Sequence, residues 1–573
     1  MFSGKFIMTK IVCCLSIVSL LFSYKLEAQV HIPPAEEFEY YYRILQVSGL
    51  SDVNGSFTIR PFSPRGESDD WHPWHSTGYF SNEKKVSSSS RHIHLNLFEP
   101  VFFQSYNTHV PRGANDGAIW QGKGYNMAVS AGVYAKAGPL YIFFRPQAGM
   151  AQNLEFDLGP YPPAEISVVT EDYFGEATEF AYRGFRGVID YVQRYGDATF
   201  NWFDLGQSSV ELRYSGLRLA LSNTLIWTGP AVHNSLQFGY NAPGFKHLYL
   251  GTYRPIQTPA GSFEFFYLFG GTRKSDYFDK DGAFRSRQSV NSLFVTYSPR
   301  FIPGLSAGAL RTFFHSYPTS FSEYRFQSSK LFEAIVRAGL GTPGLPDGYD
   351  PDNQVASVFL RWVFPSAGFE VYSEYGRNDH NADLRDFRRQ PNHQRAYTLG
   401  LIKTSMLKKS RLLVLNIEIN QFEPMRTALS RGDNYLGGWY THAQQVFGLT
   451  NDGQIMGSGY GPGVNMQMLK TDVYHSGGRL GMKIARIAYH NSRVDQYFHF
   501  IQAANENFVE HDDVRNIEIL VGAEITKFFR HGIELSAVID QSLIFNHHNL
   551  KGNDITNTRF ELVLRKQVRG WLR

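Results

Sequence analysis

The stretch "SSVELRYSGLRLALS", residues 208–222, limits most sharply what this chain can fold into. Two runs of alternating apolar and polar side chains are separated by the turn residues Ser215-Gly216. Successive side chains of a strand point to opposite faces, so the pattern indicates a β-hairpin. One face would carry Leu and Tyr, whereas the other would carry Glu211, Arg213 and Arg218. The two sides of this hairpin therefore need very different environments.

The same period of two recurs beyond about residue 90, for example at 412–422, 479–487 and 558–565. In the first of these, Leu415 falls on the apolar face and Asn416 on the polar one. The connections alternate in length. Short turns are predicted at 137–138, 215–216, 299–304, 366–368, 408–411 and 530–532, and long polar connections at roughly 109–123, 153–198, 227–246, 270–288, 315–353, 379–394 and 423–476. This alternation is typical of a transmembrane barrel.

A lipid-facing barrel explains both faces of these strands. The apolar face would meet lipid, the polar face would meet the lumen, and closure would remove the sheet edges that lipid does not tolerate. A secreted sandwich rarely sustains the pattern through so many hairpins with long loops at one end. The prediction is an all-β fold, a transmembrane antiparallel β-barrel of about 18 strands with a short N-terminal periplasmic helix.

The N-terminus predicts export. Lys5 and Lys10 precede an apolar run, and Leu26-Glu27-Ala28 is similar to a signal-peptidase site. The predicted organisation is a signal peptide at 1–28, a periplasmic segment at 29–90 with one helix, and an outer-membrane barrel at 91–573. Both cysteines of the chain, Cys13 and Cys14, fall in the signal peptide, which leaves no thiolate metal site or disulfide. No other stretch offers the roughly 18 apolar residues of a membrane helix.

Two segments depart from the strand pattern and predict helices. Residues 33–49 place Phe38, Tyr41 and Leu45 on one face, with Pro34 in a first turn. Residues 328–341 have Ser329 as a candidate N-cap, and their apolar stripe predicts that they cover the mouth of the barrel.

Residues 196–266 resemble the Wzi-type capsule assembly family, most clearly in "WTGPAVHNSL", "NAPGFKHLYLGTYRP" and "TPAGSFEF". The earlier "NDGAIWQGKGYN", residues 115–126, fits the same family. The resemblance implies an outer-membrane barrel that binds capsular polysaccharide and anchors or assembles the capsule, with polysaccharide, outer-membrane lipid and periplasmic export machinery as partners. It implies no enzymatic activity and no cofactor.

Saccharides offer apolar ring faces and many hydroxyl groups, which aromatic and amide side chains bind by stacking and hydrogen bonding. Three predicted outer loops carry such residues. The candidate polysaccharide-binding residues are Trp120, Gln121, Trp227, Asn234, Ser235, Asn241, Trp439 and Tyr440. The strand at 217–226 would deliver Trp227 to the outer rim. The alternative is that Trp227 belongs to an interfacial aromatic girdle and that the loop amides only shape the loop.

Other function classes have weaker support. A formal charge of +4 over 573 residues, without a basic stripe, argues against nucleic acid as a partner. His72 and His75 are separated by Pro73, which disfavours a helical metal site, so no metal is predicted. His547 and His548 are expected to be solvated. A porin or passive channel is the main alternative, because about 18 strands enclose an aqueous lumen unless loops fill it. An outer-membrane hydrolase is a third.

Overall fold

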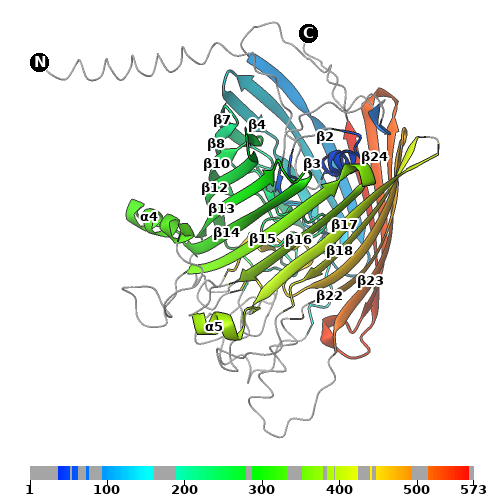
Figure 1. The fold of residues 1–573 in the computed structure, drawn as a ribbon. Coiled ribbons are helices and arrows are strands. Elements are labelled where there is room, and N and C mark those ends of the chain that lie inside the picture. Colours follow the sequence, from blue (N-terminus) through cyan, green and yellow to red (C-terminus); the bar gives the residue numbers. More distant parts are fainter. Residues whose placement is uncertain are drawn as a thin grey trace, which may run out of the picture.

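The structure is a computed structural model that describes residues 36–51, 55–61, 72–75, 93–159, 189–278, 287–332, 352–378, 384–392, 394–408, 410–423, 439–441, 447–489, 491 and 514–566. These residues form a closed antiparallel barrel, in which the last strand pairs with the first (Figure 1). Three strands of the wall are interrupted and carry two labels each, namely β4 with β5, β6 with β7 and β10 with β11. Counted as continuous strands, they give a wall of 18 strands, as predicted. The predicted signal peptide lies outside the described residues.

The wall consists of β2 (Ile93–Asn107), β3 (Gly124–Ala137), β4 (Leu140–Phe144), β5 (Gln147–Ala151), β6 (Phe200–Asp204), β7 (Ser209–Tyr214), β8 (Leu217–Ser222), β10 (Lys246–Thr252), β11 (Ile256–Thr258), β12 (Gly261–Arg273), β13 (Arg287–Pro299), β14 (Leu305–Ser316), β15 (Asp352–Phe364), β16 (Phe369–Asn378), β17 (Arg395–Leu407), β18 (Arg411–Gln421), β21 (Asn465–His475), β22 (Gly478–Tyr489), β23 (Asn516–Phe529), β24 (Ile533–Phe545) and β25 (Ile555–Lys566). Two short sheets pair β1 (Ile59–Arg60) with β9 (Trp227–Thr228) and β19 (Thr450–Asn451) with β20 (Gln454–Ile455). The α-helices are α2 (Glu37–Val47), α4 (Phe321–Ser329) and α5 (Leu384–Arg389). Among the described residues, no helix has the length and apolar character needed to cross a membrane.

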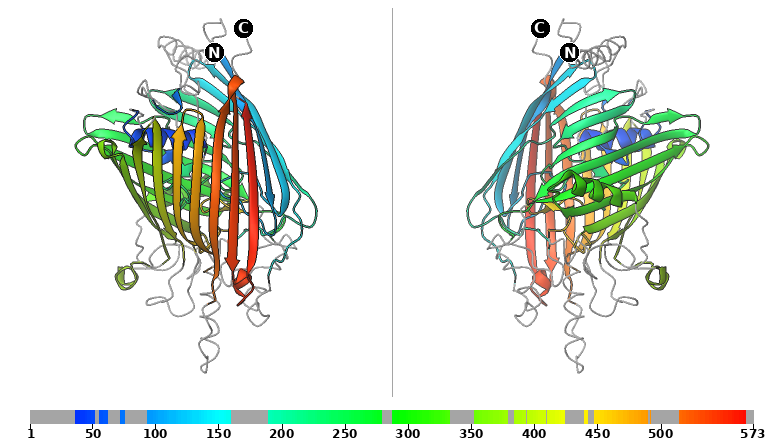
Figure 2. Two further views of the ribbon diagram at one scale, coloured as in Figure 1. Left: turned by 90° about the vertical axis from the view of Figure 1, so that its right-hand side faces the viewer. Right: turned by 90° about the vertical axis from the view of Figure 1, so that its left-hand side faces the viewer.

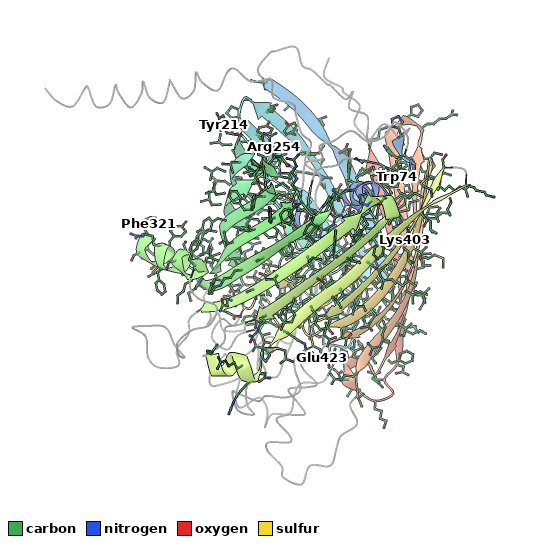
Figure 3. All side chains as sticks on the ribbon, viewed as in Figure 1. Trp74, Tyr214, Arg254, Phe321, Lys403 and Glu423 are labelled. Carbon is green, nitrogen blue, oxygen red and sulfur yellow. The ribbon has the colours of Figure 1, made fainter. Side chains whose placement is uncertain are left out.

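The tight turns gather at one end of the barrel, called here the turn end, and the long connections gather at the opposite loop end (Figures 1 and 2). Tyr214 and Arg254 mark the turn end, and Glu423 marks the loop end (Figure 3). Ser215 and Gly216 both have positive φ, 49° and 95°, which is the conformation that a two-residue hairpin turn requires. The alternation of connection lengths read from the sequence is therefore confirmed.

The two faces of the opening hairpin also lie as predicted. On β7 and β8, Leu212 and Leu221 are 51% and 67% exposed on the outer wall. Glu211, Arg213 and Arg218 point into the barrel and are buried. There Arg213 forms an ion pair with Glu211 at 2.7 Å, and the Arg218 guanidinium lies 3.9 Å from the ring centroid of Tyr249. Polar residues that lipid would reject are thus paired inside.

Helix α2 lies inside the barrel toward the turn end, as the dark blue helix in Figure 2 shows. Phe38 and Tyr41 of the predicted apolar face pack with Trp74, and Tyr41 stacks on its ring at 4.1 Å. The predicted helix is confirmed, but its surroundings are those of a lumenal plug. Arg43 explains why: its guanidinium is buried, and it bonds Glu370 of the wall and the Pro230 carbonyl oxygen.

The connection between β8 and β10, residues 223–245, also enters the lumen. Its β9 pairs with β1, and the backbone N–H groups of Val232, His233 and Asn234 donate to the Glu418 carboxylate of the wall. Gly229 has φ +79°, and a Cβ there would lie 2.0 Å from a Glu374 oxygen. Together with α2, 55–61, 72–75 and 447–464, this connection forms what we call the lumenal plug. Its apolar residues pack on the inward phenylalanines of the wall.

The second predicted helix is in part misplaced. Helix α4 begins at Phe321 with Ser320 as its N-cap, and a 3₁₀ turn, η2 (Lys330–Phe332), follows it. Residues 333–341 lie outside the described residues. The helix packs on the outer wall, so the prediction that this segment covers the mouth is wrong for its described part (Figure 2). The outer wall offers polar partners that a sequence pattern alone does not place.

The barrel topology predicts which connections antibodies reach. We expect an epitope inserted at Ser215-Gly216 to stay hidden on intact cells, because this turn lies at the turn end. An epitope inserted at Gly552, in the open β24–β25 connection at the loop end, should be labelled. Immunofluorescence on intact and permeabilised cells measures both, and permeabilisation should expose the first site. Labelling of the first site on intact cells would contradict this orientation and would place the turn end outside the cell.

Candidate functional site

A cavity of about 520 Å³ lies between the lumenal plug and the wall formed by β21 to β25. Its lining includes loop-end residues such as Trp120 and His548, and it extends to Glu36 and Glu37 beside α2. The strands place alternate side chains on its surface, because every second residue of a barrel strand points inward. The cavity is therefore bounded by the loop connections, by the charged inner wall and by the N-terminal turn of α2.

The loop-end part of the cavity combines aromatic rings with hydrogen-bonding groups. Trp120 meets the ring of Tyr195 edge-on at 5.0 Å, and among the described residues its buried indole N–H has no hydrogen-bond acceptor. Gln121 donates to the Asp116 carboxylate at 2.8 Å. Burial, and secondarily the nearby charge of Glu561, raises the pKa of Asp116 to about 7. A carboxyl group that titrates near neutral pH can serve as donor or acceptor.

Tyrosines and an arginine extend this aromatic surface. Tyr191, Tyr460 and Tyr489 line the same cavity. Arg112 lies 4.8 Å from the ring centroid of Tyr489 and pairs with Glu518 at 2.9 Å. An arginine held by a carboxylate and an aromatic ring keeps a fixed orientation.

Ion pairs cover the inner wall deeper in the cavity. Lys483 lies between Glu524 at 3.3 Å and Asp540 at 3.0 Å, and Asp540 also bonds Arg559 at 2.7 Å. Arg559 continues to Glu561 at 2.5 Å. These charges balance one another locally, so the surface is polar without a large excess of one sign. It presents fixed donors and acceptors to whatever enters.

The first turn of α2 contributes the boundary nearest the turn end. Glu36 pairs with Arg145 at 2.9 Å and with Arg565 at 3.4 Å. Glu37 pairs with Arg479 at 2.5 Å and accepts from the Thr526 hydroxyl at 2.6 Å. Two carboxylates thus tie the start of the helix to neighbouring parts of the wall, Glu36 to Arg145 and β25, and Glu37 to β22 and β23.

The eight residues predicted to bind polysaccharide divide into two groups. Trp120, Gln121 and Asn241 line the cavity. Trp227, Asn234, Ser235, Trp439 and Tyr440 are buried within the plug or where it meets the 439–441 segment.

The predicted position of Trp227 at the outer rim is wrong, and so is the alternative position in an aromatic girdle. Its ring is fully buried in the lumen, 4.5 Å from the Arg60 guanidinium. Asn234 accepts from the Gly459 N–H, and Ser235 donates to the Phe238 carbonyl oxygen at 2.6 Å. The reason is that the connection after β8 turns inward onto Glu418.

Trp439 and Tyr440 hold two connections together. Both donate to the Leu236 carbonyl oxygen, Trp439 from Nε1 at 3.2 Å and Tyr440 from its hydroxyl at 2.7 Å. The Tyr440 hydroxyl also accepts from the Ser458 N–H at 2.8 Å. Trp439 and Tyr440 are therefore buried because they bind the lumenal plug, and their polar atoms are used in these contacts.

Sequence reasoning missed several cavity residues. For Arg559 and Glu561 the sequence did contain a signal. They alternate with the apolar Phe560 and Leu562, which places Arg559 and Glu561 on the predicted lumenal face. His547 and His548, expected to be solvated, are instead buried in the lining, and His548 Nε2 bonds the Asp157 carbonyl oxygen at 2.7 Å. Burial lowers the pKa of His547 to about 3, so it is neutral at physiological pH.

In the described part of the chain, no group of three or more His, Cys, Asp or Glu side chains is placed to hold a metal ion. His72, one of the two histidines considered above, bonds the Tyr41 hydroxyl at 3.1 Å. It therefore belongs to the packing around α2.

The closed wall of 18 strands, its apolar outer face and the charged residues paired inside it define an outer-membrane β-barrel with a plugged lumen. Among solved structures, the chain is similar to Wzi, described as an outer membrane protein of Escherichia coli that is involved in group 1 capsule assembly and is a carbohydrate-binding β-barrel. That match covers 93% of this chain and 98% of Wzi, with a TM-score of 0.57 and 10% identity. The resemblance read from the sequence is thus confirmed as a likeness of fold.

Two further solved barrels match less closely. OprD of Pseudomonas aeruginosa matches at 10% identity and a TM-score of 0.35, over 83% of this chain and 95% of OprD. OccAB3 of Acinetobacter baumannii matches at 10% identity and a TM-score of 0.39, over 82% of this chain and 98% of OccAB3. No family model and no curated protein matches the sequence.

Proposed function

We propose that this barrel binds capsular polysaccharide in the loop-end part of its cavity and holds the capsule at the cell surface without cleaving it. One observation carries the proposal: Trp120, with an indole N–H that has no acceptor among the described residues, stands beside Gln121, Asp116 and Arg112 in one cavity. An aromatic face with adjacent amide, carboxyl and guanidinium groups matches the apolar faces and hydroxyl groups of a sugar chain. The fold shared with Wzi, a carbohydrate-binding barrel, supports the same proposal.

Weak single sites suffice for this function. A polymer of repeating units engages many barrels at once, and multivalency multiplies the effect of each site. A passive channel, the alternative from the sequence, needs an open lumen. The occupation of the lumen by the plug, with α2 tied to the wall by Glu36 and Glu37, favours retention over steady conduction.

Replacing Trp120 with alanine tests the proposal. Stacking on an aromatic ring is worth about 1–3 kcal/mol for a nucleobase, and a similar value for a sugar predicts about 5- to 150-fold weaker binding. The probe is capsular polysaccharide purified from the source strain, titrated against the barrel in detergent. Trp362→Ala is the matched control, because Trp362 lies on the outer wall and bonds the Pro303 carbonyl oxygen.

The outcomes separate the three functions. Weaker binding in Trp120→Ala with unchanged binding in Trp362→Ala supports recognition in the cavity, and equal binding by both variants contradicts it. Release of new reducing ends from the polysaccharide by the unaltered protein would instead indicate a hydrolase. A steady current across planar bilayers would indicate a channel.

A further inference from the structure

Helix α4 and the 3₁₀ turn η2 lie against the outside of the barrel, over β12 to β14 (Figure 2, right). The Tyr267 hydroxyl meets the hydroxyls of Tyr324 and Ser328 at 3.1 and 2.9 Å, and Phe269 meets the Tyr324 ring edge-on at 4.6 Å. Tyr267 and Phe269 are outward-facing residues of β12, because Phe266 and Leu268 between them point into the lumen. The helix is therefore held on the outer wall.

The wall beneath the helix also presents polar groups. Ser289 donates to Gln327 Oε1 at 2.8 Å, and Asn291 donates to the Gln327 carbonyl oxygen at 3.0 Å. Arg311, on the outer face of β14, donates to the Leu331 carbonyl oxygen at 3.2 Å and to Gln354 at 2.7 Å. Helix α4 and η2 thus cover polar groups that bare lipid would leave without partners.

The polar residues beneath α4 and η2 mark the loop-end limit of the apolar belt on these strands. Nearer the turn end, the outward residues include Val295 on β13 and Val358 and Leu360 on β15, which are 41%, 58% and 37% exposed. Nearer the loop end, the outward residues include Ser289, Asn291, Arg311 and Gln354, and the Arg311 guanidinium lies 4.7 Å from the ring centroid of the outward Phe313. Helix α4 lies at this change, which is where a membrane meets water.

The side chains of α4 and η2 that face away from the wall include large aromatics. Phe321 and Phe332 are 73% and 76% exposed, and Phe326 is 48% exposed with the Lys330 ammonium 4.9 Å from its ring centroid. Phe321 projects away from the barrel (Figure 3). Ser322, Arg325 and Ser329 share the exposed surface, so it mixes aromatic and polar groups.

We propose that α4 and η2 form an interfacial anchor that inserts Phe321 and Phe332 into the outer-leaflet lipid around the barrel. Aromatic side chains flanked by polar groups favour the headgroup level of a bilayer. Lipid is the occupant because the exposed rings continue the apolar belt that already contacts it, and because the helix lies beside the wall and away from the cavity. The anchor covers the polar residues at the edge of the belt and fixes the β14–β15 connection to the membrane surface.

Spin labels measure this directly, because the chain has only Cys13 and Cys14, which are replaced by serine for the experiment. Phe321→Cys and Phe332→Cys are each labelled in the full-length protein, reconstituted in vesicles of phosphatidylethanolamine and phosphatidylglycerol. Oxygen concentrates in lipid and a charged nickel chelate stays in water, so the ratio of the two accessibilities reports depth. Val358→Cys on the wall is the lipid reference, and Lys551→Cys in the β24–β25 connection is the aqueous one.

The proposal expects the ratio at both positions to approach that of Val358→Cys and to exceed that of Lys551→Cys several-fold. An aqueous ratio at either position overturns it. Low accessibility to both reagents also overturns it, because the rings would then be buried against protein, as in contact with a second copy.

Discussion

Replacing Glu370 with alanine is expected to release α2 from the barrel wall. The Glu370 carboxylate accepts from Arg43 of α2 and from Arg361 of β15, the latter at 2.6 Å, and all three side chains are buried. Removing the shared acceptor leaves two buried guanidinium groups without their counter-charge. The loss of one partner of a buried ion pair costs about 3–5 kcal/mol. The free energy of local opening of α2 should fall by that amount.

Hydrogen–deuterium exchange of the reconstituted protein measures this change. Amides of 36–51 should exchange about 10²- to 5 × 10³-fold faster in Glu370→Ala, since exchange follows the free energy of local opening. Amides of β22 to β24 should keep their protection. Arg43→Met is the matched control, because Glu370 then retains Arg361 and the helix loses only its own cation. Its effect should be clearly smaller, and an equal effect in the two variants would contradict a shared acceptor.

Planar-bilayer recording adds a functional measurement of the same release. Helix α2 borders the cavity at Glu36 and Glu37, so its departure should turn a closed barrel into one that conducts steadily. Replacing 320–332 with a Gly-Ser segment of equal length should leave the conductance unchanged, because α4 lies on the outer wall. If the amides of α2 lose their protection in Glu370→Ala but the barrel still does not conduct, the residues that block the lumen would be those of 223–245.

The wall of this barrel was predictable from sequence because its strands and tight turns are specified by residues that are close together in the chain. Each strand shows a period of two, and each tight turn carries its own residues, as at Ser215-Gly216. Glu211, Arg213 and Arg218 could be placed in the lumen because lipid leaves a charge no other side. The strand number follows from counting such runs.

The plug and the site were less predictable because their partners are far apart in sequence. Glu418 accepts from backbone N–H groups of 232–234, more than 180 residues away, and no local pattern reports such a contact. Trp227 was therefore expected at the rim although it packs on Arg60. Trp120, Gln121 and Asn241 reached the cavity lining by the same loop reasoning, which selects residue types but does not decide between a surface loop and an inward one.

The barrel also predicts a large difference between neighbouring residues of one strand. Leu415 and Asn416 fall on the outer and inner faces as expected, but Asn416 bonds Tyr372 and His233, so its side offers no space for a test. Val538 and Ile539, in the middle of β24, are better suited. Ile539 is 45% exposed on the outer wall, whereas Val538 lines the cavity.

Ile539→Arg is expected to destabilise the folded barrel by about 2–4 kcal/mol, because an arginine near the midplane of the lipid face loses its hydration. Val538→Arg should cost far less, since its guanidinium would enter a polar cavity beside Glu524, Asp540 and Glu561. Urea unfolding in lipid vesicles gives both free energies, and the mobility shift between heated and unheated samples on a gel gives the folded fraction. Detergent-solubilised samples provide a control, because micelles deform around a charge and should narrow the difference. Equal destabilisation of the two variants in vesicles would mean that β24 does not separate lipid from lumen.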